Sequence, residues 1–121
     1  MATMNSVIEY VDGVKPNVYE ETDKYRWINK LEGLISTEVF GMAEPMQYDV
    51  PAAADTELLA MHPFDDIYAF YLFAMIDFHN REYNNYNNSM LMFTERLDAL
   101  KNYYIQRHAH GKAHNFRNVM G

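Results

Sequence analysis

Hydrophobic and polar positions alternate most regularly between Pro63 and Arg107, where bulky residues recur in steps of four and three. The residues that carry this repeat are Leu72, Ile76, His79, Tyr83, Tyr86, Met90, Phe93, Leu97, Leu100 and Tyr104. The spacing is a heptad repeat, which predicts a helix with one continuous apolar seam. The repeat keeps its phase through Asn84–Asn88, although asparagine favours caps and turns. We therefore expect one long helix and keep a hairpin of two helices as the alternative.

An unbroken helix over this stretch would be about 65 Å long, at roughly 1.5 Å per residue. A compact monomer of 121 residues is about half as wide. Most of the seam would then lack a partner in its own chain, so we expect its second half to contact other subunits. The predicted subunit interface consists of Tyr83, Tyr86, Met90, Phe93, Leu97, Leu100 and Tyr104.

Two shorter helices are expected before the seam. Ser6 and Glu9 have the spacing of a capping box, and the helix that they begin is stopped by Gly13 and Pro16. Thr22 or Asp23 can cap the second helix, and Gly41 lies just beyond its end. The apolar face of that second helix is Tyr25, Ile28, Leu31, Ile35 and Val39.

The connection from Gly41 to His62 is unusually long for a small domain and has no helical period. Two interpretations stay open: a mobile loop pinned by its few apolar residues, or a loop that contacts a partner. Pro63 then stands where a helix begins, and the apolar run Ile67–Ile76 is expected to be buried on several sides. The predicted fold is all-α, with the two shorter helices packed on the long C-terminal helix or hairpin.

Residues 111–121 are expected to form an extended C-terminal tail after a helical domain of residues 1–110. The tail has too few apolar residues to fold alone, so we expect it to become ordered only on a partner. The residues expected to bind that partner are Lys112, His114, Asn115, Phe116, Arg117 and Met120.

Charge is distributed unevenly behind the net value of −7. Residues 1–98 hold all 17 acids and six of the ten Lys and Arg, a net charge of −11, whereas residues 99–121 hold four bases and no acid. An acidic body lacks the clustered cations that bind DNA phosphates, so it suits a surface that DNA passes without sticking. The chain has no cysteine, no stretch long enough to span a membrane and no secretory signal. We expect one soluble domain.

No group of residues has the pattern of an enzyme active site, so neither catalysis nor a cofactor is expected. A phosphate-binding glycine loop, a nucleophile elbow and a thiol are all missing from the sequence. His79 and Glu82 are one helical turn apart, but in the reverse order of a di-iron motif. His108, His110 and His114 could ligate a metal, yet nothing fixes their geometry, so adventitious binding is the expected outcome.

The chain resembles the head-tail connector proteins of tailed bacteriophages, also called adaptor or head-completion proteins. The resemblance is carried by Ser6–Val11, Asp23–Asn29, His62–Tyr68, Ile76–Asp77 and Glu82–Ser89. It implies a structural protein of the virion neck, assembled in the bacterial cytoplasm. Its subunits would form a ring of twelvefold symmetry that contacts the portal protein and a tail or stopper protein and lets DNA pass. Extended termini in this class often grip the portal or a neighbouring subunit.

A small helical regulatory module is the alternative function. Such a protein would bind one partner through the same seam and would remain a monomer or dimer. The mass of the assembly separates the two functions.

Overall fold

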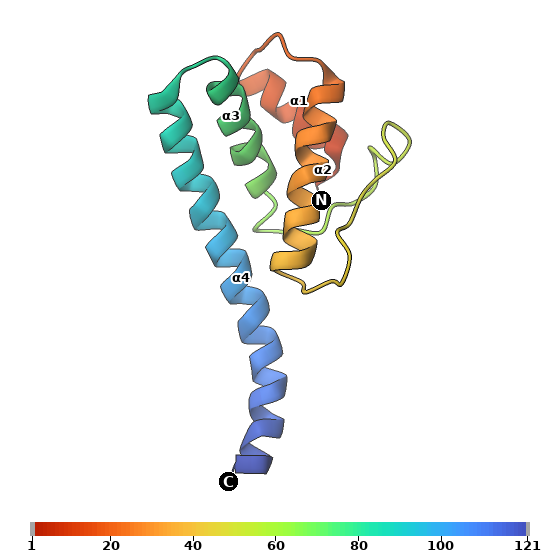
Figure 1. The fold of residues 1–121 in the computed structure, drawn as a ribbon, viewed down its shortest axis with the longest axis vertical. Coiled ribbons are helices and arrows are strands. Elements are labelled where there is room, and N and C mark those ends of the chain that lie inside the picture. Colours follow the sequence, from red (N-terminus) through yellow and green to blue (C-terminus); the bar gives the residue numbers. More distant parts are fainter. Residues whose placement is uncertain (1, 121) are drawn as a thin grey trace.

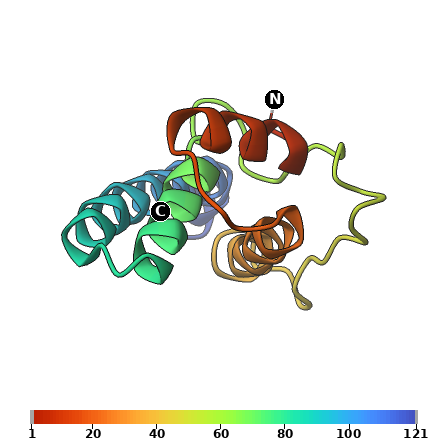
Figure 2. The same cartoon turned by 90° about the horizontal axis from the view of Figure 1, so that it is seen from above.

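The computed structural model describes the backbone of residues 2–120 and the side chains of residues 2–107. Over that range it is all-helical, with helices α1 (Met4–Val14), α2 (Glu21–Glu38), α3 (Ile67–His79) and α4 (Tyr83–Met120). Helix α3 lies in the centre and packs against each of the other three (Figures 1 and 2). Two shorter N-terminal helices thus pack on a hairpin of α3 and α4, which confirms the all-α prediction in its hairpin form.

The core forms where the apolar faces of α1, α2 and α4 meet around α3. Helix α3 is buried on several sides, as its apolar sequence predicts: Ile67, Leu72 and Ile76 are fully buried. The predicted face of α2 is also confirmed, because all five of its residues are buried. They are Tyr25, Ile28, Leu31, Ile35 and Val39.

Helix α1 begins three residues earlier than predicted. Thr3 is the N-cap, and its hydroxyl accepts a hydrogen bond from the Ser6 backbone amide at 3.1 Å, while the Ser6 hydroxyl accepts one from the Thr3 amide at 2.8 Å. The capping box is therefore Thr3–Ser6 rather than Ser6–Glu9. Serine at the third position closes it in the same reciprocal way as glutamate would.

The turn between α3 and α4 lies at Asn80–Glu82, so the expectation of one continuous helix is wrong. The Glu82 amide donates to the Asp77 carbonyl at 2.8 Å, and the Arg81 amide donates to the Phe78 carbonyl at 3.0 Å. These two bonds form a Schellman motif, which ends a helix with a left-handed residue. Arg81 has that conformation, with a φ of 61°. Asn84–Asn88 is helical, as predicted, but belongs to the next helix.

Helix α3 begins at Ile67, four residues after the predicted start at Pro63, because residues 62–66 form turns that lead into it. At the other end of the chain, α4 continues to Met120. The expected extended tail is therefore helical in backbone, with no break at residue 110. Gly111 costs a helix only about 1 kcal/mol relative to alanine, and no proline follows Pro63 to stop α4.

Candidate protein-binding surfaces

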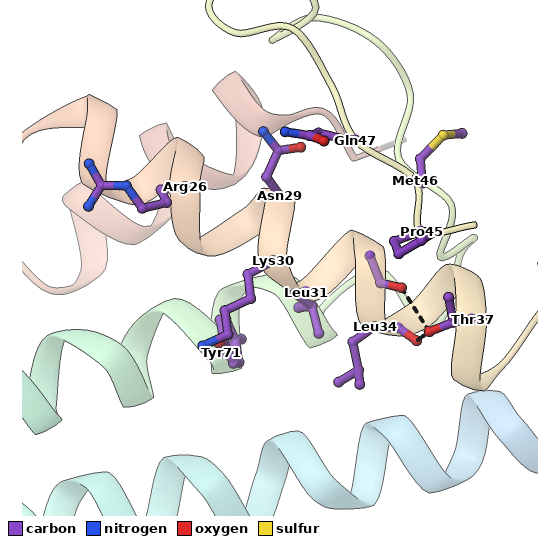
Figure 3. A pocket seen from close by; sticks show the side chains of 11 residues that line it. Arg26, Asn29, Lys30, Leu31, Leu34, Thr37, Pro45, Met46, Gln47 and Tyr71 are labelled. Atoms are coloured by element: carbon purple, nitrogen blue, oxygen red, sulfur yellow. Dashed lines mark hydrogen bonds between the residues drawn. The ribbon is translucent and has the colours of Figure 1, made fainter.

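The outward face of α2 lines a groove of about 590 Å³, which we call the α2 groove. Arg26, Lys30, Leu34 and Thr37 follow one another along α2 at helical spacing, and the Lys30 side chain extends toward Tyr71 of α3 (Figure 3). Pro45, Met46 and Gln47 from the long connection lie on one side, and Tyr71 from α3 lies on the other. The groove is thus built from three separate segments of the chain.

The segment Pro45–Tyr48 is fixed to α2 by hydrogen bonds from polar side chains. The Asn29 side-chain amide donates to the Tyr48 carbonyl at 3.1 Å and accepts from the Tyr48 amide at 2.9 Å. About two turns further along, the Ser36 hydroxyl accepts from the Met46 amide at 2.9 Å. A wall held through its backbone in this way is preformed rather than assembled by a ligand.

Glu32 fastens the same connection from inside the core. Its fully buried carboxylate accepts hydrogen bonds from the Tyr48 hydroxyl at 2.7 Å, the Leu59 amide at 3.0 Å and the Tyr68 hydroxyl. The Tyr68 hydroxyl in turn accepts from the Ala60 amide at 2.8 Å. Burial, together with the Glu32 carboxylate, raises the pKa of both tyrosines above their ordinary value. The connection is thus pinned by polar groups as well as apolar ones, and its contact with a partner stays a prediction.

The α2 groove carries positive charge on a protein that is acidic overall. Its lining includes two cations, Arg26 and Lys30, and no acid. Arg26 forms an exposed ion pair with Asp23 at 3.4 Å, and Lys30 has no ion-pair partner within residues 2–107. Apolar and aromatic side chains supply much of the remaining surface. The groove therefore suits a segment that combines apolar and acidic side chains.

A second exposed surface lies at the end of the molecule where α1 turns into α2 and α3 turns into α4 (Figure 1). Four apolar side chains are exposed there, and we call them the apolar end: Val14 (57% exposed), Val18 (91%), Phe78 (47%) and Tyr83 (55%). Exposed apolar residues are common when they are scattered singly. A group of them at one end of a small protein is typical of an interaction surface.

Aromatic side chains pack against one another next to the apolar end and connect its two turns. The Trp27 ring stacks on the His79 ring with centroids 5.4 Å apart and planes 11° apart. Tyr19 approaches Trp27 edge-on at 5.8 Å, and its hydroxyl donates to the Asn80 side-chain oxygen at 2.7 Å. His79 is thus a stacking residue of the α1–α2 and α3–α4 turns.

The apolar end is also held by a buried acid. Asp77 is fully buried; it forms an ion pair with Lys15 and accepts a hydrogen bond from the Ser89 hydroxyl at 3.3 Å. One carboxylate thereby joins the segment after α1, the end of α3 and the first turns of α4. Removing one partner of such a pair leaves a buried charge uncompensated, which is costly.

The predicted subunit interface lies largely inside the fold, so its assignment as an intersubunit surface is corrected. Phe93 and Leu100 are buried, and Met90, Leu97 and Tyr104 are partly buried and pack against the core. Tyr86 is half-buried beside Phe78, with ring centroids 5.3 Å apart. The reason is the turn at Asn80–Glu82, which folds α4 back so that α3 covers the seam. Only Tyr83 remains well exposed.

The residues expected to bind a partner through the tail lie outside the described side chains. They are Lys112, His114, Asn115, Phe116, Arg117 and Met120. The same holds for the histidine cluster His108, His110 and His114. Among the side chains that the structure does describe, no group of three or more His, Cys, Asp or Glu could hold a metal ion.

Sequence reasoning missed the α2 groove. The signal that could have found it is Leu34, an apolar residue on the polar side of α2, in line with Arg26 and Lys30. The opposite wall could not have been predicted, because it depends on which residues of the long connection reach back to α2.

Comparisons with known proteins add no further guide: a scan against protein-family models and searches of curated proteins and of solved structures gave no match. Within the described part of the chain, no helix is long and apolar enough to cross a membrane. The exposed surfaces are therefore the basis for inferring a function.

Proposed function

We propose that this chain is a structural subunit of the head-tail connector of a tailed bacteriophage. In this role, copies of the chain form a ring in the virion neck, between the portal protein and the tail or stopper protein, through which DNA passes. The observation that carries the proposal is the apolar end, where Val14, Val18, Phe78 and Tyr83 stand exposed on a rigid support. A preformed apolar surface at one end of a helical body is suited to docking on another protein.

Three further features support the same role. The sequence resemblance to connector proteins spans nearly the whole chain, and the body is acidic, with a net charge of −11 over residues 1–98. Negative charge around a channel keeps DNA phosphates from adhering to the wall. The basic C-terminal segment, whose sequence contains Lys112, Phe116 and Arg117, is suited to tethering the subunit to an acidic surface of the portal or of a neighbour.

The alternative regulatory module is supported less well. It requires the seam to be free for one partner, whereas Phe93 and Leu100 of the seam are buried within the chain. A regulator that used the apolar end instead would still be a monomer or dimer, so assembly state separates the two functions.

The experiment that tests the proposal mixes the purified chain with purified portal rings and images the product by electron microscopy. We expect an added ring of density on one end of the portal. Replacing Phe78 and Tyr83 together by serine removes half of the apolar end and should reduce the docked fraction by about tenfold or more, as loss of interface anchors does. Met61→Ser, which alters an exposed residue of the long connection, is the matched control and should dock normally. If the portal rings show no added density at any concentration of the wild-type chain, the proposal is overturned.

A further inference from the structure

The side of α4 that faces away from α3 carries a second charged and apolar surface, which we call the α4 stripe. Leu91, Glu95 and Asp98 follow one another at helical spacing and are all exposed, with Leu91 at 59%. They lie opposite Phe93 and Leu100, which face the core. The α4 stripe is therefore free to meet another molecule.

The two acids of the α4 stripe have no counterion among the described side chains. Within residues 2–107, neither Glu95 nor Asp98 takes part in an ion pair. Like charges three residues apart on a helix repel each other. A cationic partner would relieve that repulsion.

The cations of the α2 groove provide the complementary arrangement. Four of the six bases in residues 1–98 have ion-pair partners, namely Lys15, Lys24, Arg26 and Arg96. Lys30 is not among them and lies in the groove, one turn from Arg26. Leu34 follows one turn further on and is 40% exposed. Along α2 the order is thus cation, cation, leucine.

The order along α4 is the reverse: leucine, acid, acid. The span from Arg26 to Leu34 is about 12 Å and the span from Leu91 to Asp98 is about 10.5 Å at 1.5 Å per residue. If the two helices pack antiparallel, Leu91 meets Leu34, Glu95 meets Lys30 and Asp98 meets Arg26. Each charge then has a partner of opposite sign, and the two leucines contact each other beside the apolar lining of the groove.

The two surfaces of one chain cannot meet each other. Helices α2 and α4 are not in contact, because α3 lies between them (Figure 2), and the α4 stripe faces away from α3. The complementary surface must therefore come from another molecule. An interface between two different patches of the same subunit is heterologous, and heterologous contacts repeat around a ring when the rotation closes.

We propose that the α4 stripe of one copy packs antiparallel on the outward face of α2 of the next copy, and that this contact joins neighbours in the ring. The inference rests on the proposed function and names its lateral interface. The apolar end remains free for the portal or tail, so lateral and end contacts use different parts of the molecule.

Charge reversal on the full-length chain tests the contact. Arg26→Glu with Lys30→Glu, and separately Glu95→Lys with Asp98→Lys, should each weaken self-association by about tenfold or more at physiological salt, measured by native mass spectrometry and light scattering. Mixing the two variants in equal amounts should restore assembly with alternating composition, because every contact is then complementary again. Unfolded variants could not restore it, so the rescue also controls for folding. Glu9→Lys with Glu20→Lys makes the same change in net charge as the α4 variant, at sites outside both surfaces, and should assemble as the wild type does.

Cysteine cross-linking tests the contact when free copies associate weakly, and the chain contains no native cysteine. The double variant Arg26→Cys with Asp98→Cys should oxidise to a ladder of linked copies, whereas each single variant should stop at the dimer or below. Two results would overturn this lateral contact and leave the proposed function standing. In the first, both charge-reversed variants assemble as well as the wild type does. In the second, the double cysteine variant assembles but forms no ladder on oxidation. Absence of any assembly by the wild type, alone or with portal, would instead overturn the proposed function.

Discussion

At the scale of single residues, Arg81 has the conformation most at odds with its chemistry. Its φ of 61° is left-handed, which costs a residue with a Cβ atom roughly 1–2 kcal/mol. The Schellman motif requires that conformation, and glycine usually supplies it. A strained arginine at this position makes the turn depend on the packing of the two helices that it joins.

Arg81→Gly should therefore raise the free energy of unfolding by about 0.5–1 kcal/mol, because relief of strain exceeds the extra entropy of glycine in the unfolded chain. Arg81→Ala removes the same side chain but keeps the Cβ atom, so it should give little or no gain. Urea denaturation of the three proteins measures the difference. Equal stability of the glycine and alanine variants would show that the backbone at residue 81 is not strained.

The buried network around Glu32 gives a prediction about pH. Tyr68 keeps its proton in the folded protein well above its ordinary pKa of 10.0, because burial and the Glu32 carboxylate raise that pKa. Above pH 10 the unfolded chain releases this proton and the folded chain does not, so the free energy of unfolding falls as pH rises. Below pH 10 Tyr68 is protonated in both the folded and the unfolded chain, so its contribution to the free energy of unfolding is fully present.

Tyr68→Phe should cost about 1–3 kcal/mol at pH 7, because the variant leaves the buried Glu32 carboxylate and the Ala60 amide each without one partner. It should also make the decline above pH 10 shallower by up to about 1.4 kcal/mol per pH unit. Tyr48 also donates to the Glu32 carboxylate, so it contributes to the decline in the free energy of unfolding above pH 10 in both proteins. Chemical denaturation at pH 8, 10 and 11 provides the comparison, and parallel declines for the two proteins would contradict it.

At the scale of elements, the heptad pattern predicted the apolar face of α4 correctly but not what covers it. Spacings of three and four residues are the same in a hairpin within one chain and in a coiled coil between chains. The deciding feature was the turn before Tyr83, and its usual sequence signal, glycine, is replaced by Arg81. The faces of α2 and α3 were predictable because most of the buried residues on these helices are apolar. The walls of the α2 groove were not, because they depend on hydrogen bonds made by Asn29, Glu32 and Ser36 to a distant loop.

Truncating Leu100 tests whether the seam is core. Leu100 is fully buried and Leu91 is 59% exposed. Leu100→Ala should lower the free energy of unfolding by about 2–5 kcal/mol, since it leaves a cavity, whereas Leu91→Ala should change it by less than about 0.5 kcal/mol. Urea denaturation at low protein concentration separates folding from assembly. If Leu100→Ala is as stable as the wild type and fails only to assemble, the seam is a subunit interface rather than part of the core.

At the scale of the whole molecule, three exposed surfaces differ in chemistry and position, and the proposed ring subunit would use each for a different contact. The apolar end offers a docking face, while the cationic α2 groove and the acidic α4 stripe lie on separate sides of the α-helical body. Ionic contacts between copies are screened by salt and apolar contacts are not. Raising the salt concentration should therefore loosen copies from one another before it releases them from a portal.

The mass of the full-length chain under native conditions tests the central claim of ring assembly most directly. Native mass spectrometry over a range of concentrations, alone and with portal, should show a closed complex at a fixed multiple of 14.2 kDa, with twelve copies where the portal sets the symmetry. A monomer or dimer under every condition, with no mass added to the portal, would contradict ring assembly.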